Sequence, residues 1–152
     1  MKKLLLLSAV LFQLSSFAQD ANLRKAQFNL EKGIAIQGYD PVAYFIQNKA
    51  VEGDKANAVF YAGATYYFSS IANKEEFKKN AAKYEPQYGG WCAYAMGSKG
   101  QKVEVDPETF KIINGKLYLF YNKAFNNTLK TWNKDEANLK TAADKNWIKI
   151  FH

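Results

Sequence analysis

The chain is poor in the residues that staple small proteins or bind soft metals. Its 152 residues include one cysteine, one histidine, two methionines and three prolines. One cysteine cannot form an internal disulfide, and the histidine, His152, is the last residue and a weak basis for a Ser-His-Asp triad. A chain of this length can bury a core without metals or disulfides. The sequence therefore predicts one domain held together by its hydrophobic core.

Long apolar runs are also missing, except at the start. Residues 1–18 combine two lysines, an apolar run over residues 4–12 and a small-residue end at Ala18, which is the pattern of a cleaved secretory signal. The run is too short for a transmembrane helix, and no later run approaches the ~18 residues that such a helix needs. Cleavage would leave Gln19 as the mature N-terminus. We therefore expect a periplasmic or secreted protein with no membrane span.

Runs of like charge are absent as well. The net charge of +7 falls to +5 when the two signal lysines are removed, and the remaining lysines are interleaved with Asp and Glu. Nucleic-acid-binding arms carry runs of five or six like charges, and export also argues against nucleic acid as a partner. The sequence predicts a solvated basic surface; the alternative is loose attraction to anionic cell-envelope material.

Apolar and aromatic runs predict two β-hairpins. One covers residues 59–68, with Gly63 in the turn, and the other covers residues 110–121 around Asn114-Gly115. The alternating residues 102–106 predict a further half-buried strand. The sequence thus indicates strands that pair with their neighbours along the chain.

Helices are expected after each hairpin. Asn73 and Glu76 match a capping box, which predicts a helix start at Asn73, and Asn133 with Glu136 predicts another. Apolar spacing over residues 125–132 predicts a helix between the second hairpin and the second capping box. Each hairpin is therefore expected to have a helix to pack against.

The two hairpins resemble each other. Gly63–Phe68 resembles Gly115–Phe120, and Asp40-Pro41 resembles Asp106-Pro107, which indicates two ββα pseudo-repeats. We predict an α+β fold, with a small antiparallel sheet of hairpins and packed helices. The predicted order is a signal peptide over residues 1–18, an N-terminal arm over residues 19–32 and the domain over residues 33–152.

The stretch from Tyr84 to Met96 carries the strongest functional candidates. It holds the only cysteine, Cys92, and the only Gly-Gly pair. Cys92 and Met96 are four residues apart, which places thiolate and thioether on one face of a helix or strand, where they could hold copper or another soft metal ion. The bland alternative is that both sulfurs pack in the core.

A small-ligand pocket is the second candidate. Glycines let the backbone approach a ligand closely, and aromatic rings with polar tips are typical of small-molecule sites. The predicted ligand-binding residues are Tyr39, Asp40, Tyr88, Gly89, Gly90, Trp91 and Tyr94. Alternatively, the glycines only make a tight turn, the aromatic residues fill the core and Asp40 caps the turn before Pro41.

Several of these residues carry a resemblance to a known family. Asp40-Pro41-Val42, Tyr66–Ser70, Phe77 and Tyr84 resemble the YHS domain, a module of heavy-metal transport ATPases and of stand-alone secreted proteins. The longer run over residues 38–122 is similar to the exported single-domain branch of that family. The resemblance implies the fold more strongly than any function.

The departures from the family matter for metal binding. In the metal-associated modules, cysteines stand at the positions of Ala43, Ser69 and Asn73. A soft-metal site needs converging thiolates or imidazoles, so the usual metal site of the family is not carried over.

The sequence leaves three functions open. The first is a non-catalytic exported protein that binds a small ligand or metal ion around the Gly-Gly stretch. The second is a thiol-dependent redox enzyme that uses Cys92, which would need a base or a positive dipole near the thiol. The third is an interaction protein that dimerises, with Cys92 as a candidate bridge.

Overall fold

The first half of the molecule is a four-stranded sheet with short helices packed on it. A helical segment over residues 20–27 precedes it. Its elements are β1 (Leu30–Glu31), β2 (Ile34–Ala35), the 3-10 turn η1 (Ile36–Gly38), α2 (Ala43–Ile46), β3 (Asp54–Tyr61), β4 (Ala64–Phe68), α3 (Ile71–Lys79) and α4 (Ala81–Tyr84). The strand order is β1-β2-β4-β3. The β3–β4 pair is the predicted hairpin, and β2 adds to β4 in parallel.

The second half carries the other predicted hairpin and the longest helix of the domain. Its elements are the 3-10 turn η2 (Gln87–Gly90), α5 (Ala93–Lys99), β5 (Asp106–Ile113), β6 (Lys116–Phe120), β7 (Asn122–Lys123), β8 (Asn126–Asn127), α6 (Thr128–Trp132) and α7 (Glu136–Phe151). The strands β5 and β6 are antiparallel around Asn114 and Gly115, whose φ angles of 50° and 71° match the expected tight turn.

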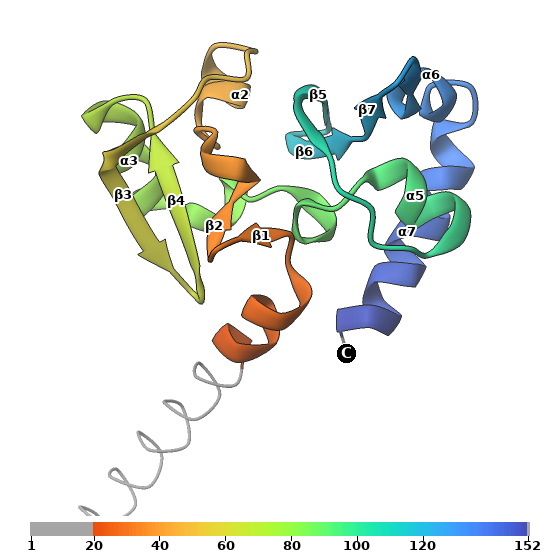
Figure 1. The fold of residues 1–152 in the computed structure, drawn as a ribbon, viewed down its shortest axis with the longest axis horizontal. Helices are drawn as coiled ribbons and strands as arrows, with labels where there is room; N and C mark the ends of the chain where they lie inside the picture. The colour runs from red at the N-terminus through yellow and green to blue at the C-terminus, as the bar shows by residue number, and fades with distance from the viewer. Residues whose placement is uncertain (1–19, 152) are drawn as a thin grey trace, which may run out of the picture.

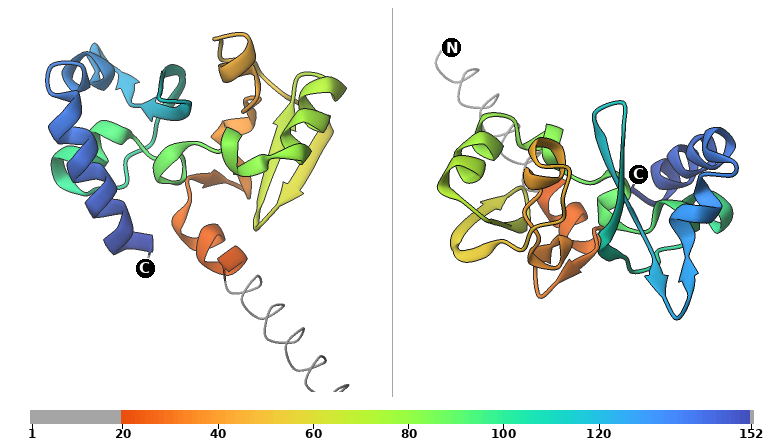
Figure 2. Two further views of the ribbon diagram at one scale, coloured as in Figure 1. Left: turned by 180° about the vertical axis from the view of Figure 1, so that it is seen from behind. Right: turned by 90° about the horizontal axis from the view of Figure 1, so that it is seen from above.

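This computed structural model describes residues 20–151 and confirms the α+β class. The predicted signal peptide, its cleavage site before Gln19, and His152 lie outside the described residues. The two halves lie side by side, with the loop that contains η2 passing between them (Figures 1 and 2). No helix within residues 20–151 is long and apolar enough to cross a membrane.

The predicted start of the first helix is wrong by three residues. Ser70 is the N-cap of α3, and its hydroxyl accepts a hydrogen bond from the backbone N–H of Asn73 at 3.1 Å. Asn73 lies inside the helix, and its side chain donates to Asp40 instead. The helix therefore starts at the Ser70 cap, because the Asn73 side chain bonds to the buried Asp40 carboxylate and does not cap the helix.

Three other sequence predictions also need correction. Of the strand predicted over residues 102–106, only Asp106 lies in a strand, β5; the Val103 oxygen before it accepts from the Cys92 N–H at 2.9 Å. The helix expected from residue 125 begins at Thr128, since β7 and β8 occupy residues 122–127. Asn133 is the C-cap of α6 and does not cap α7.

The two halves share one core. Val42 and Tyr44 of the first half belong to the same buried cluster as Cys92, Leu117 and Leu119 of the second half. The Tyr44 hydroxyl also donates to the Pro107 carbonyl at 2.9 Å. The halves are therefore packed into one body. A second cluster, around Met96 and Trp132, lies within the second half alone.

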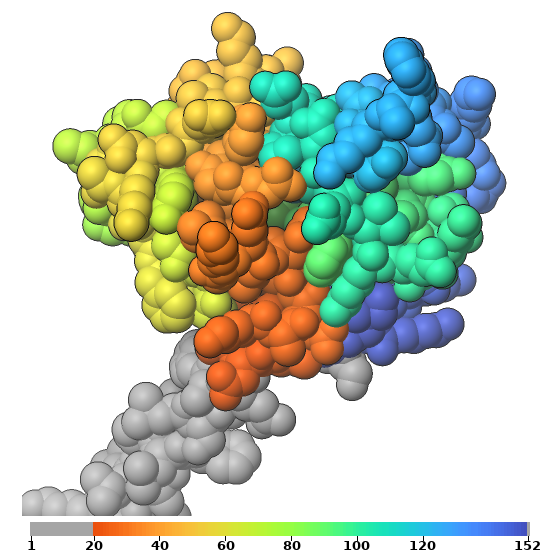
Figure 3. All heavy atoms as spheres, in the orientation of Figure 1, coloured from red at the N-terminus to blue at the C-terminus, as the bar shows by residue number. Residues whose placement is uncertain are grey.

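The segment before β1 ties both halves together. Arg24 donates to the Ala62 carbonyl at 2.7 Å and pairs with Glu85. The Phe28 ring lies 6.1 Å from the Trp147 ring, measured between centroids. In the space-filling view, this segment lies beneath both halves and against the end of α7 (Figure 3).

The two hairpins match in register as well as in length. Asp54 pairs with Phe68 and Asp106 with Phe120, and an irregularity follows directly in both hairpins. Each aspartate accepts a hydrogen bond from the backbone N–H two residues later. All these equivalent positions are 52 residues apart (54 to 106, 68 to 120). Asp106 thus corresponds to Asp54 and not to Asp40, and the division of the domain into two ββα pseudo-repeats stays a prediction.

Candidate functional site

The correspondence of the two halves extends to the loops that hold the predicted site residues. In both loops three consecutive residues have positive φ angles: 52°, 52° and 87° over residues 36–38, and 55°, 60° and 86° over residues 88–90. The Asp40 N–H then donates to the Val51 carbonyl at 2.8 Å, as the Cys92 N–H does to Val103. Asp40 and Cys92 therefore hold equivalent positions, 52 residues apart (40 to 92).

Asp40 is the centre of a closed hydrogen-bond cluster. Its carboxylate is 0% exposed. One oxygen accepts from the backbone N–H groups of Val42 and Ala43 at 2.9 and 3.3 Å. The other accepts from the Ser69 N–H and hydroxyl at 2.8 and 2.6 Å and from the Asn73 amide at 2.7 Å. The cluster ties α2, the end of β4 and α3 together and leaves no free oxygen lone pair for a ligand.

The three positions that the predicted resemblance aligns with cysteines of metal-associated YHS modules all meet at this cluster. Ala43, Ser69 and Asn73 each donate to Asp40. In this chain none of the three residues carries a thiol, and all three donate hydrogen bonds to a carboxylate. The bonds from Val42 and Ala43 are those of the turn cap that was the alternative for Asp40, and the bonds from Ser69 and Asn73 add to them.

Cys92 has fewer and weaker partners than Asp40. It is also 0% exposed. The Tyr121 N–H donates to its sulfur at 3.3 Å, and the sulfur lies 3.4 Å from the Thr128 hydroxyl oxygen. Thr128 donates its single hydroxyl proton to the Tyr121 carbonyl at 2.9 Å, so the Cys92 S–H is the donor to Thr128. The thiol is thus oriented by the end of β6 and the start of α6.

A cavity of about 370 Å³ opens beside this thiol. Its inner surface is buried and its rim is exposed and polar. The residues that line it are Cys92, Tyr94, Ala95, Ser98, Lys99, Gln101, Val103, Tyr121, Asn126 and Thr128. The volume lies at the small end of the range of ligand sites, which is about 300–1,000 Å³. Two of the predicted residues, Cys92 and Tyr94, therefore lie at one cavity.

Met96 does not join Cys92 as a second sulfur in that cavity. Its side chain is buried in the second core cluster, whereas Cys92 belongs to the shared one. Within residues 20–151 there is no group of three or more His, Cys, Asp or Glu placed to hold a metal ion. Since Cys92 is fully buried, an intermolecular disulfide through it would require the cavity wall to open.

The other predicted residues separate into different surroundings. The Tyr88 hydroxyl donates to Asp144 at 2.8 Å, and burial together with this carboxylate raises the pKa of Tyr88. Tyr88 and Gly89 line a second hollow, of about 390 Å³, with Trp147. Trp91 donates its indole N–H to the Gln27 carbonyl at 2.7 Å. The structure therefore does not bring the predicted set together at one place.

Gly90, Gly89 and Tyr39 serve the loops themselves. A Cβ on Gly89 would lie 2.7 Å from Phe28 and 2.9 Å from Trp147, so that glycine is required by close packing. A Cβ on Gly90 would meet no atom closer than 3.5 Å, but its φ of 86° favours glycine. Tyr39 forms an isolated bridge with Glu52. The two glycines therefore have a role in the turn itself, which does not depend on a ligand.

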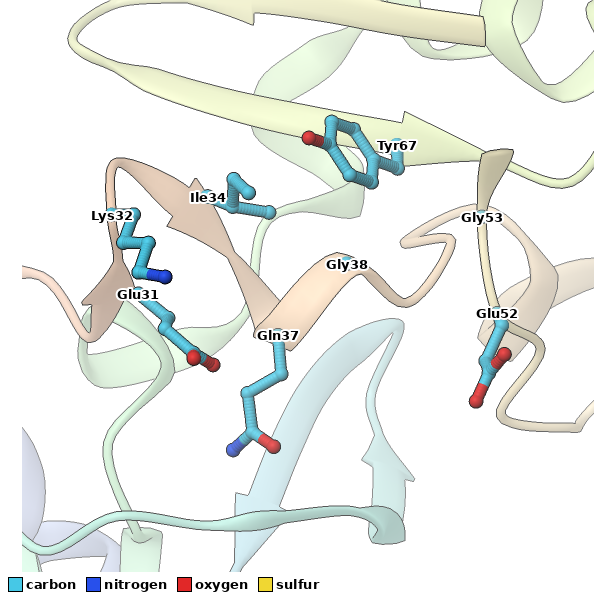
Figure 4. Close-up of a pocket in the computed structure, with 8 residues that line it drawn as sticks. All are labelled: Glu31, Lys32, Ile34, Gln37, Gly38, Glu52, Gly53 and Tyr67. Atoms are coloured by element: carbon cyan, nitrogen blue, oxygen red, sulfur yellow. The ribbon is translucent and has the colours of Figure 1, made fainter. Parts of the chain in front are cut away.

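A third hollow, of about 470 Å³, lies in the first half beside Gly38 and Tyr67. The Tyr67 ring lies over Gly38, where a Cβ would be only 3.3 Å away. The side chains of Glu31, Gln37 and Glu52 project away from that ring (Figure 4). Because its polar groups do not converge, this hollow is a weaker site than the cavity beside Cys92.

Sequence reasoning missed Tyr121 and Thr128, which orient the thiol. One sequence signal could have found the first of them. Val51-Glu52-Gly53-Asp54 nearly repeats as Val103-Glu104-Val105-Asp106, and that spacing aligns Cys92 with Asp40. It also aligns Tyr121 with Ser69, and both donate their N–H to the central side chain. The two Asp-Pro pairs, at residues 40–41 and 106–107, suggest a different spacing and therefore a different alignment of the halves.

Comparison with known proteins adds no further information on the site. No protein-family model matches the chain, and no curated protein or solved structure matches it. The resemblance to the YHS domain therefore stays a prediction that rests on the residues quoted above.

Proposed function

We propose that the protein is a non-catalytic binding module that takes a small organic molecule in the cavity beside Cys92. The observation that carries the proposal is the contrast between two equivalent positions. Asp40 is enclosed by five hydrogen bonds, whereas Cys92 has two partners and borders a cavity. Both side chains are buried, but only the backbone arrangement around Cys92 has a cavity beside it.

The lining of the cavity suits a binding role. Ala95 and Val103 supply an apolar inner surface over the buried Cys92, and Tyr94 and Tyr121 add aromatic side chains. Ser98, Gln101 and Asn126 supply hydrogen-bonding groups at the exposed rim. An apolar interior with a few polar groups at the entrance is the usual composition of a small-molecule site.

The setting of this role follows from the sequence. The signal-peptide pattern of residues 1–18 supports export to the periplasm or the medium. The resemblance to the exported single-domain branch of the YHS family supports the same setting. The ligand would then be a small molecule met in the cell envelope.

The proposal is tested by protein-observed NMR with a library of small organic fragments. Binding fragments are expected to shift the backbone amides of Cys92, Tyr94 and Tyr121. A Ser98→Trp variant places an indole at the cavity rim and should abolish these shifts. Ser98→Ala should retain them.

A matched control separates blocking from a general effect of the added indole. Thr131 is exposed on α6 and does not line the cavity, so Thr131→Trp should bind fragments as the unaltered protein does. Fragment shifts that gather at another hollow, or that persist in Ser98→Trp, would overturn the proposal.

A further inference from the structure

We infer that the occupant of the Cys92 cavity is a small planar aromatic carboxylate. This inference rests on the proposed function and adds the chemical class of the ligand. It follows from the charge of the lining residues and from the placement of the two tyrosines.

The lining of the cavity carries one cation and no anion. Lys99 is the only charged residue among those that line it. Lys99 forms no salt bridge among the described residues, unlike Lys123 of the same half, which pairs with Glu104 at 3.9 Å. A ligand carboxylate would therefore meet an ammonium group with no competing acidic partner, and a ligand amine would be repelled.

The position of Lys99 on α5 sets the orientation that a charged ligand would take in the cavity. Lys99 is the last residue of α5, and Cys92 is the N-cap of the same helix. The ammonium group and the buried thiol are thus at opposite ends of the helix of seven residues that borders the cavity. A bound molecule would place its carboxylate at the rim and its ring toward the apolar inner surface.

Two tyrosines give the cavity aromatic walls. Tyr94 and Tyr121 are each half-buried, pack against the shared core and line the cavity. Aromatic side chains attract planar rings, both face to face and edge to face. With a volume of about 370 Å³, the cavity can accommodate one or two fused rings. Ser98, Gln101 and Asn126 offer N–H or O–H donors to the carboxylate at the rim.

The test compares three probes that share one ring and differ in charge. Benzoate, benzamide and benzylamine are titrated into the purified protein, and dissociation constants are taken from the amide shifts of Cys92 and Tyr121. Benzoate is expected to bind up to about fivefold more tightly than benzamide, and benzylamine most weakly, since an exposed charge pair contributes up to about a factor of five. Raised salt should weaken benzoate binding only.

Variants assign the effect to Lys99. Lys99→Gln should reduce the benzoate affinity to that of benzamide, and Lys99→Arg should restore most of it. Lys130→Gln is the control, because Lys130 is exposed on α6 outside the cavity. Equal affinities for benzoate and benzamide, unchanged in Lys99→Gln, would overturn the inference while leaving the cavity as a binding site. If no probe and no fragment shifts the Cys92 amide, the proposed function is contradicted as well.

Discussion

The two halves build the same backbone frame around different central side chains. A buried carboxylate must have its oxygens satisfied, so Asp40 recruits Ser69 and Asn73 and closes the space around it. A thiol makes weak hydrogen bonds and tolerates an apolar setting, so Cys92 leaves space beside it. The residue at the equivalent position therefore decides the outcome. With Asp40 the loop is part of a closed hydrogen-bond cluster, and with Cys92 it forms the wall of a cavity.

The largest expected effect is on the closed half. Asp40→Ala removes the acceptor of five hydrogen bonds, leaves the N–H groups of Val42 and Ala43 without a partner and leaves the side-chain amide of Asn73 only its long contact to Ser69. We expect the free energy of unfolding to fall by about 4 kcal/mol. Urea unfolding followed by circular dichroism measures it. Asp54→Ala, at an exposed aspartate that accepts only from Ala56, should cost about 0.5 kcal/mol. Similar losses in both variants would contradict the structural role of Asp40.

A second prediction concerns the two loops with positive φ angles. Gly89→Ala would press a methyl group against Phe28 and Trp147 and should cost about 2–3 kcal/mol. The equivalent residue in the first half, Gln37, already carries a side chain at a φ of 52°. Gln37→Ala should therefore change stability by less than about 1 kcal/mol, the contribution of its hydrogen bond to Val105. Equal costs in thermal unfolding would show that packing does not distinguish the loops.

A third prediction uses alkaline pH to compare Tyr66 with its equivalent, Tyr118. Burial and then the Glu85 carboxylate raise the pKa of Tyr66 well above its usual value. The unfolded chain releases this proton near pH ~10 while the folded protein keeps it. The stability contributed by the neutral phenol is present below that pH and is lost as pH rises further, by up to about 1.4 kcal/mol per pH unit.

Phenylalanine variants measure that contribution. Tyr66→Phe should flatten the fall in unfolding free energy between pH 10 and 11. Tyr118→Phe should flatten it less, because burial raises the pKa of Tyr118 but the nearby Lys140 opposes the shift. An alkaline slope that is the same in Tyr66→Phe and in the unaltered protein would refute the assignment.

The smallest expected effect is at the open half. Cys92→Ser keeps a small group that can bond to Thr128 and Tyr121, so we expect a loss of about 1 kcal/mol or less in urea unfolding. This loss should stay well below that of Asp40→Ala. A loss of about 4 kcal/mol would mean that both central residues hold the frame equally, and the contrast between the halves would fail.

Local sequence signals predicted much of the secondary structure. The hairpin at Asn114-Gly115 follows from the backbone preference of those two residues, and Pro86 with extended Glu85 ends the helical run. Errors arose where a side chain bonded outside its own segment. Asn73 looked like a cap but reaches Asp40, which lies 33 positions earlier in the chain.

The candidate site was predicted only in part. Cys92 and Tyr94 were found because the sole thiol stands among aromatic residues. Tyr121, Thr128 and Lys99 were missed, because no local pattern shows that the end of β6 and the start of α6 meet the thiol. Met96 was assigned to the same site from its spacing, yet its side chain packs into the other core cluster.

By itself, the sequence determined the α+β class and the two hairpins, because turn chemistry and apolar alternation act over a few neighbouring residues. Only the tertiary structure decided which of two equivalent positions is closed and which borders a cavity. That outcome depends on hydrogen bonds between residues 29 to 36 positions apart, Asp40 to Ser69 and Cys92 to Thr128. Such long-range partners are fixed by the packing of helices against the hairpins, which local sequence preferences do not encode.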